Sequence, residues 1–265
     1  MDIILAATWH PRGELPRLRH LLSTLRTLYR QIVISLPPDT SEKLVETLRN
    51  IGAVSPVVTR DWAQGRFLAL EQAVQLGGGT GTWYQYADFD RLLRWVEVRP
   101  EEWRHTIGML ADADHTILGR TPSAYQTHPQ ALVETEAISN RVVSVLLGRQ
   151  EVIDVSAGSQ AFSRRAAEYL IANARHDPAL GTDGEWPILL QRAGFSMQYL
   201  QVEGLDWESA DRYREQAAGT DDQRSAASSY DADPANWHRR TQVALQIVRA
   251  ALDASQRLIE DVHES

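Results

Sequence analysis

Two aspartates one residue apart, Asp88 and Asp90, follow an apolar stretch of the chain. Trp83, Tyr84 and Tyr86 in this stretch have high strand propensity, which predicts a buried strand that delivers both carboxylates to its C-terminal end. In an open α/β sheet, ligands bind at the carboxyl ends of the strands. Two carboxylates suit a divalent ion that also binds the phosphates of a substrate. Asp-x-Asp also occurs by chance in acidic loops, so the pair alone leaves both interpretations open.

Strands alternate with helices through the first half of the chain. Leucines recur at helical spacing after the first strand, and Gly52 follows the second helix as a C-terminal signal. Alternating strands and helices of this length are typical of a parallel sheet, so we predict an α/β fold. The predicted strands are 2–8, 31–36, 54–59 and the stretch before Asp88, and the predicted helices are 14–29, 41–50 and 66–76.

The second half of the chain is less regular. We expect helices over 100–111, 129–147, 163–174 and 182–193, and strands over 115–120 and 195–202. The pattern predicts a main domain over 1–210, a polar, mobile linker over 211–233 and an amphipathic helix over 234–265. The apolar residues of that helix form one stripe, which favours association with the main domain or a homodimer. They are Val243, Ile247, Val248, Ala251, Leu252, Leu258, Ile259 and Val262.

The composition excludes several functions. The chain of 265 residues has a net charge of −8, which argues against a nucleic-acid partner. It has no cysteine, hence no disulfide, thiolate metal site or cysteine nucleophile. Lys43 is its single lysine, which leaves almost no candidate for a Schiff base or a P-loop. No apolar run approaches the roughly 20 residues of a membrane span, and no signal peptide is evident. We expect a cytoplasmic protein without an integral membrane segment.

Three motifs in this order resemble the GT-A glycosyltransferases of family 2, the group that includes dolichyl-phosphate sugar transferases and spore-coat glycosyltransferases. The first is Asp61 after the third strand, with Gly65-Arg66 opening the next helix. The second is Asp88-Phe89-Asp90. The third runs from Gly181-Thr182-Asp183-Gly184-Glu185-Trp186 to Arg192-Ala193-Gly194-Phe195. The resemblance covers roughly residues 1–205. Thr182 departs from the family's usual glutamate, and the segment Gln64–Ala69 departs from its Asn-x-Gly-x-x-x-Ala pattern.

The resemblance implies a metal-dependent transfer of a sugar from a UDP- or GDP-linked donor to a hydroxyl acceptor. Asp90 would bind Mn²⁺ or Mg²⁺ on the donor diphosphate, and Asp88 would contact the ribose or a metal-bound water. Asp183 would act as the general base in one in-line displacement, which predicts inversion at the anomeric carbon. Asp183 is also well placed to cap a helix, and Glu185 to lie in its first turn.

The same resemblance places further residues around the substrates. Donor-side candidates follow the first three strands: Ala7, Thr8, His10, Pro37, Asp61 and Arg66. Arg66 would meet the diphosphate, because arginine binds phosphates through two parallel hydrogen bonds. Acceptor-side candidates are Gly158, Ser159, Gln160 and Glu185. Asp61 is equally compatible with a solvated turn.

Two other functions are compatible with the sequence. A nucleotidyltransferase shares the α/β fold, the nucleotide and the metal, but it normally has a glycine-rich basic signature after the first strand. Trp9-His10-Pro11-Arg12-Gly13 matches that signature faintly. A non-catalytic nucleotide- or sugar-binding GT-A module is the other alternative, because of Thr182 and the altered segment around Gly65.

Overall fold

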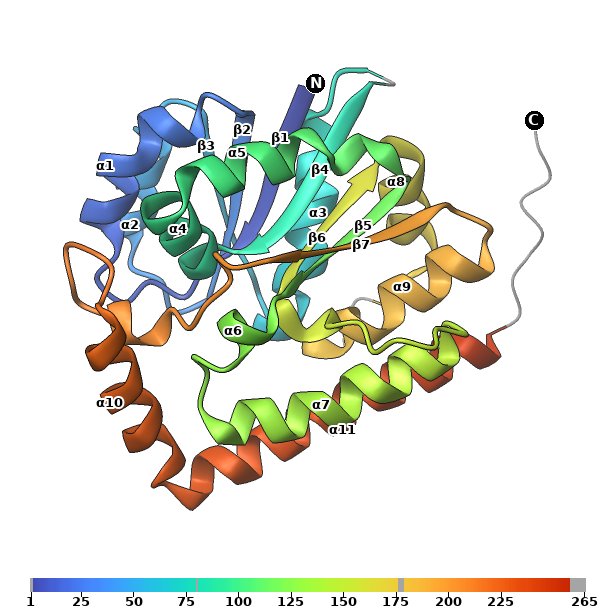
Figure 1. Ribbon diagram of the computed structural model, residues 1–265. Coiled ribbons are helices and arrows are strands. Elements are labelled where there is room, and N and C mark those ends of the chain that lie inside the picture. Colours follow the sequence, from blue (N-terminus) through green and yellow to red (C-terminus); the bar gives the residue numbers. More distant parts are fainter. Residues whose placement is uncertain (1, 80, 176–178, 258–265) are drawn as a thin grey trace.

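A seven-stranded sheet forms the centre of the computed structural model (Figure 1), which describes residues 2–79, 81–175 and 179–257. The strand order is β3-β2-β1-β4-β6-β5-β7. Only β6 runs antiparallel to its neighbours, β4 and β5. The strands are β1 (Asp2–Thr8), β2 (Tyr29–Leu36), β3 (Val54–Val58), β4 (Thr82–Asp88), β5 (His115–Arg120), β6 (Ser159–Ser163) and β7 (Met197–Val202). The predicted α/β class with a mostly parallel sheet is confirmed.

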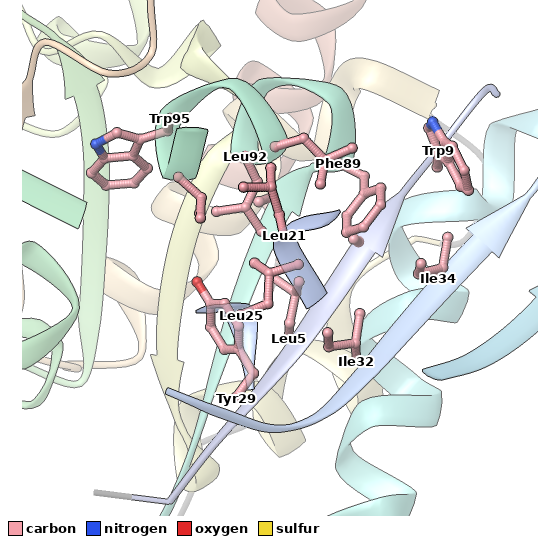
Figure 2. Close-up of a cluster of buried hydrophobic side chains, with 14 of the residues drawn as sticks. Leu5, Trp9, Leu21, Leu25, Tyr29, Ile32, Ile34, Phe89, Leu92 and Trp95 are labelled. Atoms are coloured by element: carbon pink, nitrogen blue, oxygen red, sulfur yellow. The ribbon is translucent and has the colours of Figure 1, made fainter. Parts of the chain in front are cut away.

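Helices cover both faces of the sheet, because the central strands are apolar on both sides. Leu5 and Ala7 of β1 pack on the layer formed by α1 (Leu15–Leu25), α2 (Glu42–Arg49), α4 (Phe89–Val98) and α5 (Pro100–Gly108). Figure 2 shows this core, in which Leu21 and Leu25 of α1 meet Phe89 and Leu92 of α4.

The opposite face of the sheet is covered by a second set of helices. Ile4 and Ala6, which alternate with Leu5 and Ala7 along β1, pack on this layer. It comprises α3 (Gly65–Leu76), α7 (Gln130–Leu146), α8 (Arg164–Asn173), α9 (Thr182–Arg192) and α11 (Pro234–Gln256). α6 (Pro122–Tyr125) is a single turn after β5. No helix in the described part of the chain is long and apolar enough to cross a membrane.

Two segments differ from the expectation. Asp88 ends β4 as predicted, whereas Asp90 lies in the first turn of α4, which begins at Phe89. The helical period of the next residues buries Phe89, Leu92 and Leu93, and this packing continues the chain as a helix. Residues 211–233, expected to be a mobile linker, contain a 12-residue helix, α10 (Thr220–Asp231). Asp231 at its end accepts hydrogen bonds from the first backbone amides of α7, which fixes α10 to the main body.

Part of the apolar stripe of α11 is buried within the chain itself. α11 lies along α7 and α9 (Figure 1), and Ile247, Ala251 and Ala254 are inaccessible to solvent. Leu252 of the predicted stripe remains 39% exposed, so the stripe is only partly covered over residues 234–257 and the homodimer stays a prediction. Leu258, Ile259 and Val262 of the predicted stripe lie outside the described residues.

Substituting Gly184 by alanine is expected to lower the free energy of unfolding by about 1–3 kcal/mol, the usual cost of overpacking. A Cβ atom at Gly184, in the first turn of α9, would lie 2.4 Å from the backbone oxygen of Ile247 in α11. Gly108→Ala is the matched control, because Gly108 is also helical and nothing lies within 4 Å of its added Cβ. Denaturant unfolding of both variants checks the expectation. Equal stabilities would contradict a close contact between α9 and α11.

Candidate active site

A pocket opens at the carboxyl ends of the parallel strands. Thr8 of β1, Leu36 of β2 and Asp88 of β4 line it together with Thr59, which directly follows β3. The opposite wall comes from α9 and α11, through Asp183 and the segment Arg240–Ile247. The pocket therefore lies at the strand ends, where a ligand site was predicted. It also includes α11, which was predicted to be a separate C-terminal segment.

Asp88 is held by a dense set of donors. Its Oδ1 accepts hydrogen bonds from Tyr86 Oη at 2.6 Å, Arg66 Nη2 at 3.2 Å and Thr8 Oγ1 at 3.3 Å. Burial acts to raise the pKa of Asp88, but the positive charge of Arg66 and these hydrogen bonds bring it below the ordinary value. Asp88 is thus a fixed, ionised carboxylate.

Gly158 lies directly behind Asp88. Its backbone φ is +69°, in the left-handed region, and a Cβ atom there would lie 2.3 Å from Asp88 Oδ2. The backbone amide of Asp88 donates to the carbonyl of Gly158 at 2.9 Å. Glycine is therefore required here to seat Asp88. Gly158, predicted to lie on the acceptor side, thus has a structural role beside Asp88.

Arg66 joins the two predicted acidic motifs. Arg66 is 6% exposed, and its guanidinium donates through Nη1 to Asp183 Oδ1 and through Nη2 to Asp88. The guanidinium carbon also lies 5.1 Å from the centre of the Tyr86 ring, within the range of a cation–π contact. The bridge connects residues 117 positions apart in the chain. Arg66 is therefore engaged by two carboxylates, where the sequence analysis expected it to meet the diphosphate.

Asp183 is a buried acid at the start of α9. The N-terminal cap position of α9 is Gly181, so Asp183 does not cap the helix and its side chain serves the pocket. Burial raises the pKa of Asp183 to about 7, with the negative charge of Asp88 adding to the rise and Arg66 opposing it. A carboxyl group with a pKa near neutrality can exchange a proton with a substrate under ordinary conditions.

Asp90 faces a carboxylate that the sequence analysis missed. Its Oδ1 accepts from the backbone amide of Arg91 at 3.0 Å. Burial, then the charges of Glu208 and Asp88, raise the pKa of Asp90 to about 7. Glu208 is held by Arg91, whose Nε donates to Glu208 Oε2 at 3.1 Å. Glu208 follows β7 in a polar segment, and nothing in its sequence context distinguishes it from a solvated acid.

The acids fit a cation that is shared with a substrate. No group of three or more histidine or acidic residues in the described part of the chain could by itself hold a metal ion. Mg²⁺ is commonly bound by one or two carboxylates together with substrate phosphates. Among the described residues, Asp90 forms no ion pair with an arginine side chain, and it lies at the pocket surface. Asp90, with Asp88 beside it, suits an ion that arrives with a diphosphate.

An aromatic pair lies at the end of the pocket beside β2 and β3. Trp62 is 51% exposed, and its ring centre lies 5.6 Å from that of His10 in an edge-on arrangement. Both residues line the pocket beside Ser35 and Thr59. An exposed tryptophan is costly to leave in water and offers a face on which a planar ring can stack. Trp62 was missed because its exposure depends on the short 3₁₀ turn after β3.

Three donor-side candidates reach the pocket, and three do not. Thr8, His10 and Arg66 line it. Ala7 is buried in the sheet core, and Pro37 lies outside the pocket lining. Asp61 is exposed, and its Oδ1 accepts a hydrogen bond at 3.0 Å from the backbone amide of Ala63, which caps the 3₁₀ turn. The solvated-turn interpretation of Asp61 therefore describes the structure.

The other acceptor-side candidates belong to the interior. Ser159 accepts a hydrogen bond from Gln85 at 3.4 Å, and Gln160 bonds to His115 at 2.8 Å, both across neighbouring strands. Glu185 lies in the first turn of α9, as expected, and its Oε1 accepts from Arg257 and from the backbone amide of Arg175. These contacts anchor the end of α11 and do not reach the pocket.

Replacing Arg66 by methionine is expected to lower the free energy of unfolding by about 3–5 kcal/mol at pH 8, the usual cost of removing one partner of a buried ion pair. The loss should be smaller at pH 5, because the unpaired carboxyl groups then take up protons. The double variant R66M/D183N should recover part of the loss. Arg30→Met is the control, because its pair with Asp2 is largely exposed. Equal losses in R66M and R30M would contradict the bridge.

Comparison with known proteins gives structural likeness only. No family model matches the chain, and no curated protein is similar to it in sequence. The fold is similar to glucosyl-3-phosphoglycerate synthase from Mycobacterium tuberculosis in complex with phosphoglyceric acid, with a TM-score of 0.48, 13% identity and coverage of 91% of this chain and 80% of that one. It is also similar to S. aureus TarS 1-349 in complex with UDP, with a TM-score of 0.42, 12% identity and coverage of 76% and 61%.

Proposed function

We propose that this chain is a GT-A-type glycosyltransferase that moves a sugar from a nucleotide-sugar donor to a hydroxyl acceptor, with a divalent cation and with inversion. The observation that carries the proposal is the arrangement around Arg66. One buried arginine joins Asp88, at the end of a central parallel strand, to Asp183, an acid with a pKa of about 7 on the opposite side of the same pocket. A glycosyltransferase needs a group that holds the donor diphosphate and a group that accepts the proton of the acceptor, on opposite sides of the anomeric carbon.

The donor nucleotide would occupy the strand side of the pocket. Trp62 and His10 offer a stacking surface for the base, and Ser35 and Thr59 offer hydroxyl groups nearby. Base stacking on an aromatic side chain contributes about 1–3 kcal/mol. This side supports a UDP- or GDP-linked donor equally, because stacking does not distinguish the bases.

The diphosphate would lie beside Asp88 and Asp90, with Mn²⁺ or Mg²⁺ held by Asp90 and oriented by Asp88. A bound divalent ion stabilises the negative charge that develops on the departing nucleoside diphosphate. Thr8, Tyr86 and Arg66 all donate to Oδ1 of Asp88, so this carboxylate would keep its orientation whether or not the ion is present.

Asp183 would accept the proton of the acceptor hydroxyl. Arg66 uses Oδ1 of Asp183 and restrains the carboxyl group in the pocket. A base on the opposite side from the leaving group activates a nucleophile for direct displacement, and this is the support for inversion. Arg66 would thereby act as a positioning residue for both ends of the reaction.

A thermal-shift panel tests the proposal. Nucleoside diphosphates and nucleotide sugars are added with and without Mn²⁺, and the midpoint of unfolding is measured. A ligand at a hundredfold excess over its Kd adds about 2.7 kcal/mol to the stability. We expect at least one uridine or guanosine compound to stabilise the protein, and more strongly with Mn²⁺ than without. A panel in which no nucleotide stabilises the protein would overturn the proposal.

A further inference from the structure

α11 forms a wall of the pocket next to the proposed base. Arg240, Val243 and Ile247 line the pocket, and their spacing of three and four residues places them on one face of the helix. The carbonyl of Ile247 lies against Gly184, the residue after Asp183. Seven residues of helix span about 10 Å, so Arg240 stands roughly two turns from the base along this wall.

The arginines of the pocket fall into two groups. Arg66 and Arg91 are buried and paired, with Asp88 and Asp183 in the first case and with Glu208 in the second. Within residues 2–79, 81–175 and 179–257, no ion pair reaches the three others, which are Arg12, Arg212 and Arg240. Arg240 donates from Nε to Tyr230 Oη at 3.2 Å, and Arg212 donates from Nη2 to Ser209 Oγ at 2.9 Å.

The carboxylates of the pocket are already engaged. Arg66 holds Asp88 and Asp183, Arg91 holds Glu208, and Arg120 holds Glu136 at 2.6 Å. Asp90 has no arginine partner in the described part of the chain, and the proposed function assigns it to the cation. In the described pocket lining, the three arginines of the second group form no ion pair with a carboxylate, although the charges of Glu208 and Asp90 act on Arg212.

Two of these arginines are held close together by the backbone. The amide of Tyr213 donates to the carbonyl of Arg12 at 2.8 Å, and a Cβ atom at Gly13 would lie 2.9 Å from Tyr213 Cα. Burial and the positive charge of Arg12 lower the pKa of Arg212, while Glu208, Asp90 and Glu14 oppose the shift. Adjacent like charges repel each other, and an anion bound between Arg12 and Arg212 would reduce this repulsion further.

We propose that the acceptor is an anion, and that its phosphate or carboxylate group is bound by Arg240 of α11 with Arg212 and Arg12. This inference rests on the proposed function, because it takes Asp183 as the site of the acceptor hydroxyl. Arginine is suited to such groups through its fixed pattern of donors. Arg240 lies on the same face of α11 as Ile247, whose carbonyl contacts Gly184 next to Asp183. This position favours the acceptor, and not the donor, as the ligand whose negative charge these arginines bind. Val243 and Ile247 would cover the uncharged part of the acceptor.

Calorimetric titration of two matched pairs of probes tests the inference: glycerol 3-phosphate against glycerol, and glucose 6-phosphate against glucose. Each probe is titrated into the free protein and into the protein with Mg²⁺ and the nucleoside diphosphate that binds best, at constant ionic strength. We expect at least one phosphorylated probe to bind tenfold or more tightly than its neutral partner. Arg240→Gln should remove this preference, and Arg212→Gln should weaken it. Arg239→Gln, an exposed neighbour on α11, should leave it unchanged.

The outcomes separate the two proposals. If neither pair shows a preference for the charged member, the anionic acceptor is wrong. If Arg240→Gln weakens the nucleoside diphosphate as much as the phosphorylated probe, the arginine serves the donor, and the inference is again overturned. Failure of the proposed function is seen separately, as an absence of nucleotide binding to the unaltered protein. The titrations into free protein still test the anion site in that case.

Discussion

Replacing Asp183 by asparagine is expected to reduce the rate of sugar transfer by roughly 10²–10⁴, the usual contribution of a positioned general base. Asparagine keeps the shape of the side chain and an oxygen that can accept from Arg66, but it cannot take the proton of the acceptor. The Kd of the donor should change little, because the base acts on the acceptor. Steady-state rates and donor titration on the same preparation measure the two effects. Asp253→Asn, on an exposed part of α11, is the control.

The dependence of the rate on pH provides a second test of the same residue. The pKa of Asp183 is raised to about 7, first by burial, and only the ionised carboxylate can act as a base. The rate of the unaltered protein should therefore rise as the pH increases through about 7 and then level off. In D183N this rise should be absent. Transfer at the unaltered rate in D183N, or the same pH profile in both proteins, would leave Asp183 with a structural role only.

Replacing Asp90 by alanine is expected to abolish the gain in nucleotide affinity that Mn²⁺ provides. A tenfold gain corresponds to about 1.4 kcal/mol, which calorimetry resolves easily. Among the described pocket carboxylates, Asp90 forms no ion pair with an arginine, whereas Asp88, Glu136, Asp183 and Glu208 are each paired with one. Nucleotide affinity measured without metal should remain. Asp221→Ala, fully exposed on α10, is the control.

The same substitution should stabilise the free protein at neutral pH. Burial, Glu208 and Asp88 raise the pKa of Asp90 to about 7 in the folded state, above its ordinary value of 3.8. Asp90 therefore contributes fully to the stability of the folded protein below pH 3.8, and this contribution is lost as the pH rises through about 7. Removing the carboxyl group removes this loss. A variant that is less stable at pH 8, with unchanged Mn²⁺-assisted binding, would contradict the assignment of Asp90 to the cation.

The parts of this molecule that depend on local pattern could be predicted from the sequence. The alternation of strands and helices correctly predicted a mostly parallel sheet, and the aromatic residues before Asp88 correctly predicted strand β4. Asp90 was predicted at the strand end, although it lies in the first turn of α4, because the sequence Asp-Phe-Asp does not distinguish a loop from a first helical turn. Helix α10 was missed because its residues are polar and it is stabilised by tertiary contacts, such as those from Asp231 to the start of α7.

The site was harder to predict, because several of its contacts join distant parts of the chain. Arg66 was singled out, but its partners Asp88 and Asp183 could not be assigned without the approach of α9 to α3. Glu208 reaches the pocket from the end of the predicted main domain, where it had not been singled out, and Arg240 reaches it from the segment predicted as a separate helix. Ser159 and Gln160 were expected at the acceptor, but strand pairing directs them to Gln85 and His115.

Analysis of the products of a nucleotide sugar tests the central claim most directly. The nucleotide sugar selected by thermal shift is incubated with Mn²⁺, with and without candidate hydroxyl acceptors, and the products are identified by NMR. Our account predicts release of the nucleoside diphosphate, an inverted anomeric centre in the product, and loss of the reaction in D183N. Formation of pyrophosphate from a nucleoside triphosphate and a sugar phosphate would instead identify a nucleotidyltransferase. Tight binding of the nucleotide sugar without any turnover would show a binding module and contradict the proposed transfer.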